Sequence, residues 1–216
     1  MPTGNVTSAV TALVSGLAGR LASAALPDHA ADLRRTRPTA PVTPVAASAD
    51  LPALRHLPEA IRLAPTDGTP VLVQALASAR WTQTHTYVRD PPNERFLSGY
   101  AHCTLLGPAA MSPVAVDPAG LVTLGVLLLG PHRHYPPHWH PADEVYLPLT
   151  AARWSVGDSP YLPREPGAVL HHAPTRPHAI RTDATPLLAL YLWRGDLHTP
   201  ARLVDPPDDT DRRSGP

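Results

Sequence analysis

A series of short apolar segments between residues 120 and 193 constrains the fold more than any other feature of this sequence. The segments cover residues 120–130, 144–151, 152–156, 167–174, 178–182 and 186–193. Pro and Gly separate most of them, and they recur at intervals of about 8–12 residues, which is typical of short antiparallel strands. The sequence therefore predicts a mainly β fold, a barrel or jelly roll, in this half of the chain.

The first half of the chain has a different pattern. Residues 6–26 carry apolar side chains at helical spacing, which predicts an amphipathic helix, and a further helix is expected over residues 51–61. The expected parts of the chain are an N-terminal amphipathic helix, a Pro/Ala-rich linker, a helical segment that precedes the barrel, the barrel itself and a disordered tail. In that order, these five parts cover residues 1–34, 35–50, 51–118, 119–200 and 201–216.

The charge and cysteine content exclude several functional classes. The 18 basic and 18 acidic residues give a formal net charge of +0, so no nucleic-acid partner is expected. There is no Lys, which excludes Schiff-base chemistry and a P-loop. Cys103 is the one cysteine, so no intrachain disulfide can form. With no secretory signal or membrane span recognised, a cytoplasmic bacterial protein without a membrane partner is expected.

Histidine and glutamate form the most specific motif in the sequence. His138 and His140 are two residues apart, so on a strand both side chains point to the same face. Glu144 follows on the next predicted strand, and His178 fits a distant strand packed alongside. Three imidazoles and one carboxylate suit one divalent first-row metal per chain, namely Fe²⁺, Mn²⁺, Zn²⁺, Co²⁺ or Ni²⁺. Coordination positions left open by the protein would favour catalysis over a closed structural site.

Tyr146 shares a strand face with Glu144, so its hydroxyl can lie beside the expected metal ion. A nearby divalent cation stabilises a phenolate, which makes this tyrosine a candidate general base. Ring faces attract sulfonium and quaternary ammonium ions, so the clustered aromatics could bind a cationic substrate group. The aromatic residues expected around the substrate are Tyr135, Trp139, Trp154, Tyr191 and Trp193.

The string at residues 135–149, YPPHWHPADEVYLPL, resembles the cupin superfamily and, within it, the cupin-type dimethylsulfoniopropionate (DMSP) lyases. Residues 171–182 and 187–197 extend the resemblance, which covers roughly residues 80–197. It implies a cupin β-barrel preceded by a helical segment. It also places His138, His140, Glu144 and His178 on the family's metal ligands. Tyr146 falls on the catalytic base, Tyr135 on a substrate-contacting tyrosine at the pocket mouth, and Trp193 on a pocket aromatic.

The function implied by the resemblance is a metal-dependent carbon–sulfur lyase. It would cleave DMSP, or a similar small sulfonium carboxylate, to dimethyl sulfide and acrylate. The same ligand set also serves Fe(II) dioxygenases, and a non-enzymatic metal- or ligand-binding cupin is a further alternative. The expected partners are a small-molecule substrate and, as an open question, a second copy in a homodimer. Residues 1–50 lie outside the resemblance and are expected to be dispensable for metal binding.

Overall fold

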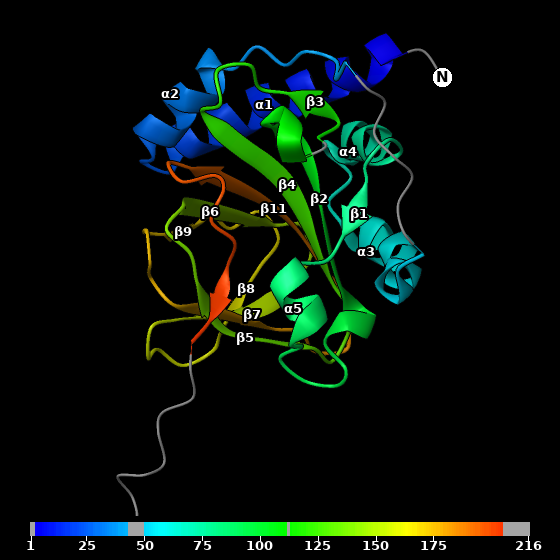
Figure 1. Cartoon of the computed structure of the whole chain (residues 1–216), viewed down its shortest axis with the longest axis vertical. Coiled ribbons are helices and arrows are strands. Elements are labelled where there is room, and N and C mark those ends of the chain that lie inside the picture. Colours follow the sequence, from blue (N-terminus) through cyan, green and yellow to red (C-terminus); the bar gives the residue numbers. More distant parts are fainter. Residues whose placement is uncertain (1–2, 43–49, 112, 205–216) are drawn as a thin grey trace, which may run out of the picture.

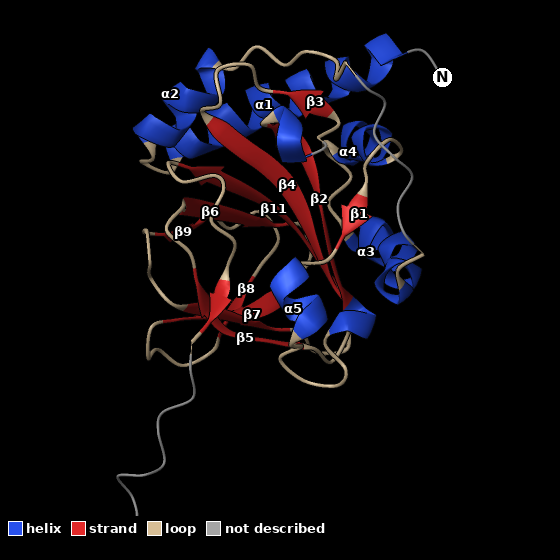
Figure 2. Cartoon of the chain, in the orientation of Figure 1, coloured by secondary structure: helices blue, strands red, loops and turns tan. Residues whose placement is uncertain are grey.

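The structure is a computed structural model, and it describes residues 3–42, 50–111 and 113–204. Two mostly antiparallel sheets face each other, and helices cover the outer face of the larger sheet (Figures 1 and 2). The larger sheet has the strand order β1-β2-β4-β11-β6-β9, with β3 paired to β2. The smaller sheet has the order β12-β5-β10-β7-β8. No strand pairing joins the two sheets within the described ranges, so the expected barrel is an open jelly roll.

The strand bounds agree closely with most of the apolar segments seen in the sequence. The strands of the larger sheet are β1 (Trp81–Thr82), β2 (Tyr100–Gly107), β3 (Ala115–Val116), β4 (Val122–Leu129), β6 (Asp143–Pro148), β9 (Leu170–His172) and β11 (Leu187–Arg194). Those of the smaller sheet are β5 (His134–Trp139), β7 (Ala152–Val156), β8 (Leu162–Arg164), β10 (His178–Arg181) and β12 (Arg202–Leu203). All six predicted apolar segments contain a strand of this jelly roll.

Helices precede the main sheets and cover one side of them. The helices are α1 (Thr3–Ser23), α2 (Pro27–Arg35), η1 (Pro52–His56), α3 (Leu57–Leu63), α4 (Thr69–Leu76), α5 (His85–Arg89), η2 (Leu97–Gly99) and η3 (Ala109–Met111). The described residues 3–35 therefore contain two helices, where a single helix was expected over residues 1–34. The chain leaves α1 through Ala25 at a φ of 60° and re-enters a helix at Pro27, because proline has no N–H but fits the first turn.

The expectation of a helical segment over residues 51–118 is only partly correct, because after residue 80 strands β1, β2 and β3 alternate with short helices. Tyr100–Gly107 forms β2, which pairs with β4 inside the larger sheet. The expected linker is also partly ordered, since Thr39 pairs with Val116 through backbone hydrogen bonds. In the expected disordered tail, Arg202–Leu203 forms β12, whereas residues 205–216 lie outside the described part of the chain. Long-range pairing holds all three segments in place.

Two apolar cores lie on opposite faces of the larger sheet. Strand β4 is buried along its whole length, with Leu124 and Leu128 in the outer core and Leu127 and Leu129 in the inner one. A strand covered on both faces reads as a continuous apolar run, which explains why β4 shows no alternation. The outer core is completed by α1, α2 and α4, and the inner core fills the space between the two sheets.

Helix α1 belongs to the outer core. Val10, Val14, Leu17 and Leu21 form its buried stripe. The window Val6–Ser23 is also long and apolar enough to cross a membrane by length and composition, with 33% of it buried in the fold. The core helix of a globular protein can be equally long and apolar, and the buried stripe of α1 accounts for its apolar character. The cellular location stays a prediction.

Candidate metal centre

The metal-binding motif lies between the two sheets. His138 on β5 is the direct register partner of His178 on β10, so the smaller sheet supplies both imidazoles side by side. Glu144 comes from β6 of the larger sheet, and His140 lies in the turn between β5 and β6. All four side chains are buried. His178 follows His138 by 40 residues in the sequence, and the fold brings it to the other three predicted ligands in the inner core.

Three of the four predicted ligands have their donor atoms in one tight group. Ligand atoms of His140, Glu144 and His178 lie within 4.8 Å of one another. The Oε2 atom of Glu144 is 3.0 Å from Nε2 of His140 and 3.1 Å from Nε2 of His178. Metal bonds of 2.0–2.1 Å at right angles would put neighbouring ligand atoms about 3.0 Å apart. The spacing therefore matches adjacent positions around one octahedral ion.

His138 lies at the edge of this group. Its ring centroid is 4.2 Å from that of His178, and the two ring planes are inclined by 65°. On its other side the His138 ring stacks on Tyr135, with centroids 3.7 Å apart and planes inclined by 2°. The stacking fixes the plane of the imidazole, so the aromatic residue before the motif orients a predicted ligand.

Backbone carbonyls fix which ring nitrogen each histidine presents. The Nδ1 atoms of His138, His140 and His178 lie 2.9 Å, 3.1 Å and 3.0 Å from the carbonyl oxygens of Pro136, Ala142 and Arg176. A carbonyl accepts hydrogen bonds, so each Nδ1 carries the proton and each Nε2 is left with a lone pair. This is the usual way in which metal-binding histidines are oriented. All three tautomers are therefore arranged for coordination through Nε2.

A buried ring nitrogen without a hydrogen-bond partner also indicates that this group of side chains binds a cation. The Nε2 atom of His178 is buried and has no hydrogen-bond partner. It lies 3.1 Å from a carboxylate oxygen, which is also an acceptor, so a shared positive charge is the simplest partner for both. The buried His/Glu/His group is compatible with one metal ion.

The pKa shifts agree with this arrangement. Burial lowers the pKa of His138 well below its ordinary value, and the neighbouring His178 acts in the same direction, so the ring is neutral. Burial opposes ionisation of Glu144, yet His140 and His178 outweigh it and hold the pKa of that carboxyl well below its usual range. A neutral His138 imidazole and an ionised Glu144 carboxylate are the forms of these groups that bind a divalent metal.

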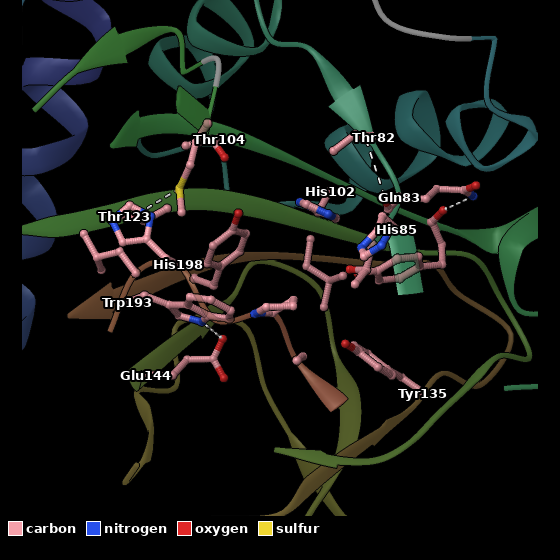
Figure 3. Close-up of a pocket in the computed structure, with 18 of the residues that line it drawn as sticks. Thr82, Gln83, His85, His102, Thr104, Thr123, Tyr135, Glu144, Trp193 and His198 are labelled. Atoms are coloured by element: carbon pink, nitrogen blue, oxygen red, sulfur yellow. Dashed lines mark hydrogen bonds between the residues drawn. The ribbon is translucent and has the colours of Figure 1, made fainter. Parts of the chain in front are cut away.

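Trp193 and Tyr146 both lie beside the Glu144 carboxylate. The indole N–H of Trp193 donates a 2.6 Å hydrogen bond to Oε1, which Figure 3 shows as a dashed line. Tyr146 lies two residues after Glu144 on β6, so both side chains are on the same face of the strand and both border the same cavity. Burial, followed by the charge of Glu144, raises the pKa of Tyr146 well above its ordinary value. Without a cation beside it, this phenol stays protonated.

A cavity of about 300 Å³ opens above these residues. Its walls include Glu144, Tyr146, Tyr135, Tyr191 and Trp193, so four of the predicted aromatic and catalytic positions face it. Glu144 and Trp193 lie on one side of the cavity in Figure 3, and residues before and within β2 lie opposite. The volume is at the small end of the range for ligand pockets, which fits a compact substrate.

Two predicted aromatic residues lie elsewhere. Trp139 is half-buried on the opposite face of β5 from His138, where its ring lies near Arg202. Strand alternation turns it away from the cavity, so the expectation that it binds substrate is wrong. Trp154 is buried behind Tyr146, with ring centroids 4.8 Å apart, and it supports that ring without lining the cavity.

Sequence reasoning missed the far wall of the cavity. Tyr100, His102 and Thr104 lie on one face of β2 and point into it, together with Gln83 and His85. An alternation of these polar residues with Ala101, Cys103 and Leu105 could have identified the strand. Sequence reasoning also missed Tyr87, which lies behind the cavity wall and whose hydroxyl accepts a 3.2 Å hydrogen bond from Tyr135.

His171 and His172 point to opposite faces of β9, as adjacent strand residues must. His172 is buried and its ring stacks on His178, with centroids 4.2 Å apart and planes inclined by 4°. Burial lowers the pKa of His172 to about 3, with His178 contributing next. His172 therefore forms a neutral wall beside the metal centre.

Comparison with known proteins decides the family. The profile of the DMSP lyase family matches residues 26–189, which is most of the chain. The chain belongs to the DMSP lyase family. The match begins at the start of α2, so it also includes residues outside the region over which the sequence motifs showed the resemblance.

Individual DMSP lyases are similar to the chain in sequence and structure. The DMSP lyase DddQ of Ruegeria pomeroyi is 33% identical over 135 residues, which are 62% of this chain and 64% of that protein. The alignment thus spans less than two thirds of the relative's length. The crystal structure of R. pomeroyi DddQ superposes with a TM-score of 0.71 at 29% identity, covering 94% of this chain and 98% of that one.

A second solved structure, of the DMSP lyases RdDddP and RnDddQII, gives a TM-score of 0.65 at 26% identity and covers 89% of this chain and all of that one. These matches confirm the predicted family and the predicted mainly β fold class with N-terminal helices. The roles of the individual site residues stay predictions.

Proposed function

We propose that this DMSP lyase family member cleaves DMSP, or a closely similar sulfonium carboxylate, by β-elimination in the cavity above Glu144. The similar DddQ of R. pomeroyi is a DMSP lyase, and its structure matches nearly the whole chain. The observation that carries the proposal is the position of Tyr146 beside Glu144 beneath a small cavity walled by aromatic rings.

His138, His140, Glu144 and His178 are the residues that would hold one divalent metal ion. The Nδ1–H hydrogen bonds orient the three histidine rings, and Trp193 orients the carboxylate. Fe²⁺, Mn²⁺, Zn²⁺, Co²⁺ and Ni²⁺ all accept this donor set. When bound, the ion supplies Lewis acidity to a substrate carboxylate and electrostatic stabilisation to a nearby phenolate.

Tyr146 is the proposed general base. Its phenolate oxygen takes the proton from the carbon next to the substrate carboxylate, and the C–H electron pair becomes the new carbon–carbon double bond. The bond from the β-carbon to sulfur breaks, and its electrons leave with dimethyl sulfide, so acrylate remains. The neutral Tyr146 then returns its proton to water. No separate general acid is required, because a sulfonium departs as a neutral sulfide.

The other cavity residues bind and orient the substrate. The rings of Tyr135, Tyr191 and Trp193 face the cavity and can hold the sulfonium, which has no hydrogen-bond donor and is attracted to ring faces. Tyr135 is buried, and its hydroxyl donates to Tyr87. Its ring stacks on His138 and borders the cavity, which suits a role in binding and orienting the substrate.

Headspace detection of dimethyl sulfide tests the proposal. Purified chain, reconstituted with each candidate divalent metal and given DMSP, should release dimethyl sulfide and an equal amount of acrylate. An oxygen electrode run in parallel examines the alternative Fe(II) dioxygenase function. Oxygen uptake without dimethyl sulfide would overturn the proposed lyase reaction.

A further inference from the structure

A second cluster of metal-ligating side chains lies behind the metal centre, on the outer face of the larger sheet. His29, Asp143 and His171 each offer one ligand atom, and the three atoms lie within 4.8 Å of one another. Asp143 and His171 immediately precede Glu144 and His172, so strand alternation turns them away from the cavity. His29 comes from α2, which Figure 1 shows over the β6 side of the fold.

The distances within this cluster suit a shared ion. Nε2 of His171 is 2.6 Å from Oδ1 of Asp143, and Nε2 of His29 is 3.3 Å from Oδ2. The two imidazole rings stand nearly perpendicular, with centroids 5.3 Å apart. Metal bonds of 2.0–2.1 Å at tetrahedral angles put neighbouring ligand atoms about 3.3 Å apart. The separation of His29 from the carboxylate matches that geometry, whereas the 2.6 Å contact between His171 and Asp143 is a hydrogen bond that a bound ion would replace.

The Nε2 atom of His29 independently points to a ligand. The side chain is only 4% exposed, and this nitrogen makes no hydrogen bond although it faces the carboxylate of Asp143. A buried ring nitrogen without a partner is rare in folded proteins. A cation between the imidazole and the carboxylate would satisfy both groups at once.

The surroundings leave Asp143 available and the site reachable. Arg194 lies 2.8 Å from Asp32 but 3.5 Å from Asp143, so its charge is paired chiefly with Asp32. The His171 side chain is 40% exposed, and that of Asp143 is 19% exposed. An ion can therefore enter from solvent, and water can fill the coordination positions that the protein leaves open.

We propose that His29, Asp143 and His171 form a second binding site for a divalent transition metal such as zinc, which fastens α2 to the outer face of the larger sheet. Two imidazoles and one carboxylate are a common donor set for this class of ion. The ligands come from α2, β6 and β9, so a bound ion cross-links the N-terminal helices to the jelly roll. The proposal is independent of the lyase reaction.

Zinc stoichiometry of the full-length chain tests this site. After treatment with a chelator, the wild-type chain should bind two Zn²⁺ ions in equilibrium dialysis. His29→Gln and His171→Asn should each bind one ion tightly, with the zinc affinity of the second site lowered by about 100-fold or more. Loss of a residue that only hydrogen-bonds to a ligand already costs about 10–100-fold in metal affinity, and these variants lose a ligand itself. His178→Ala should keep the ion held by His29, Asp143 and His171.

His132→Asn is the matched control, because it removes a histidine outside both clusters and asparagine tolerates the φ of 53° at this position. It should bind two ions. His171 is partly exposed, so its variant decides the matter if His29→Gln fails to fold. Saturating zinc should also raise the Tm of wild type more than that of His171→Asn. The second site would be overturned if His171→Asn still bound two ions. It would also be overturned if wild type bound only one ion and His171→Asn kept that ion.

Discussion

Trp193 and Glu144 are direct register partners across the β6–β11 ladder, and the indole N–H of Trp193 donates a 2.6 Å hydrogen bond to Oε1 of Glu144. The same indole also lies against His140, with ring centroids 4.3 Å apart. Trp193 therefore positions two predicted ligands as well as lining the cavity.

Trp193→Phe should consequently weaken metal binding while leaving the fold intact. The phenyl ring keeps the apolar contact but cannot donate to Glu144, and loss of such an outer hydrogen bond costs about 10–100-fold in metal affinity. Competition with a chromophoric chelator measures the change. Tyr191→Phe is the control on the same strand, because it removes only a 3.4 Å hydrogen bond to the Cys103 carbonyl. Equal metal affinity in wild type and Trp193→Phe would contradict this role.

His138→Ala and His178→Ala should each lose the ion bound at Glu144. Both side chains present Nε2 toward the inner core, and removal of either leaves too few ligands for tight binding. Elemental analysis of the purified variants gives the metal content. His56→Ala, which changes a histidine outside the cavity, should keep the full metal content. An undiminished metal content in both His138→Ala and His178→Ala would show that these two histidines are not metal ligands.

Tyr146→Phe should lower turnover by about 10²–10⁴-fold, the usual range for loss of a general base. The variant keeps the ring that packs on Trp154 and lacks only the hydroxyl, so metal and substrate binding should change little. Steady-state release of dimethyl sulfide, with kcat and KM determined separately, measures the effect.

Tyr135→Phe is the matched comparison for Tyr146→Phe. It loses the hydrogen bond to Tyr87 but keeps the ring that stacks on His138, so it should affect KM more than kcat. A near-normal kcat in Tyr146→Phe together with an inactive Tyr135→Phe would exchange the two roles.

The fold should lose stability as the pH falls from 7 to 5. Burial lowers the pKa of His102 from 6.5 to about 4, so between these values the unfolded chain binds a proton that the folded chain does not. Stability then rises with pH across this window, and this one histidine contributes a loss of about 2 kcal/mol between pH 7 and pH 5. Urea unfolding at both pH values should show a smaller difference for His102→Gln than for wild type. An unchanged difference would contradict the prediction.

The N-terminal helices should prove necessary for stability, although residues 1–50 are expected to be dispensable for metal binding. Leu21 of α1 is fully buried in the outer core, so Leu21→Ala should lower the free energy of unfolding by about 2–5 kcal/mol. Leu13→Ala, at a half-buried position of the same helix, is the control and should cost less. Equal Tm values for Leu21→Ala and wild type would show that α1 contributes nothing to the fold.

The sequence alone determined the strand pattern and the metal motif, because both are local. Period-two alternation places Glu144 and Tyr146 on one face of β6, and His140 follows directly after the end of β5, two residues beyond His138. The short apolar segments between residues 120 and 193 could be predicted as strands because the burial pattern of a strand depends on neighbouring residues in the sequence.

Tertiary structure decided everything that depends on which segments meet. Tyr100–Gly107 became a strand because β4 pairs with it, and Trp139 left the site because the pleat turns it outward. The hydrogen bond from Trp193 to Glu144 depends on the β6–β11 register, and the meeting of His29 with Asp143 depends on how α2 packs. Spacing in sequence carries no information on such contacts, because they are fixed by burial of apolar faces that lie far apart along the chain.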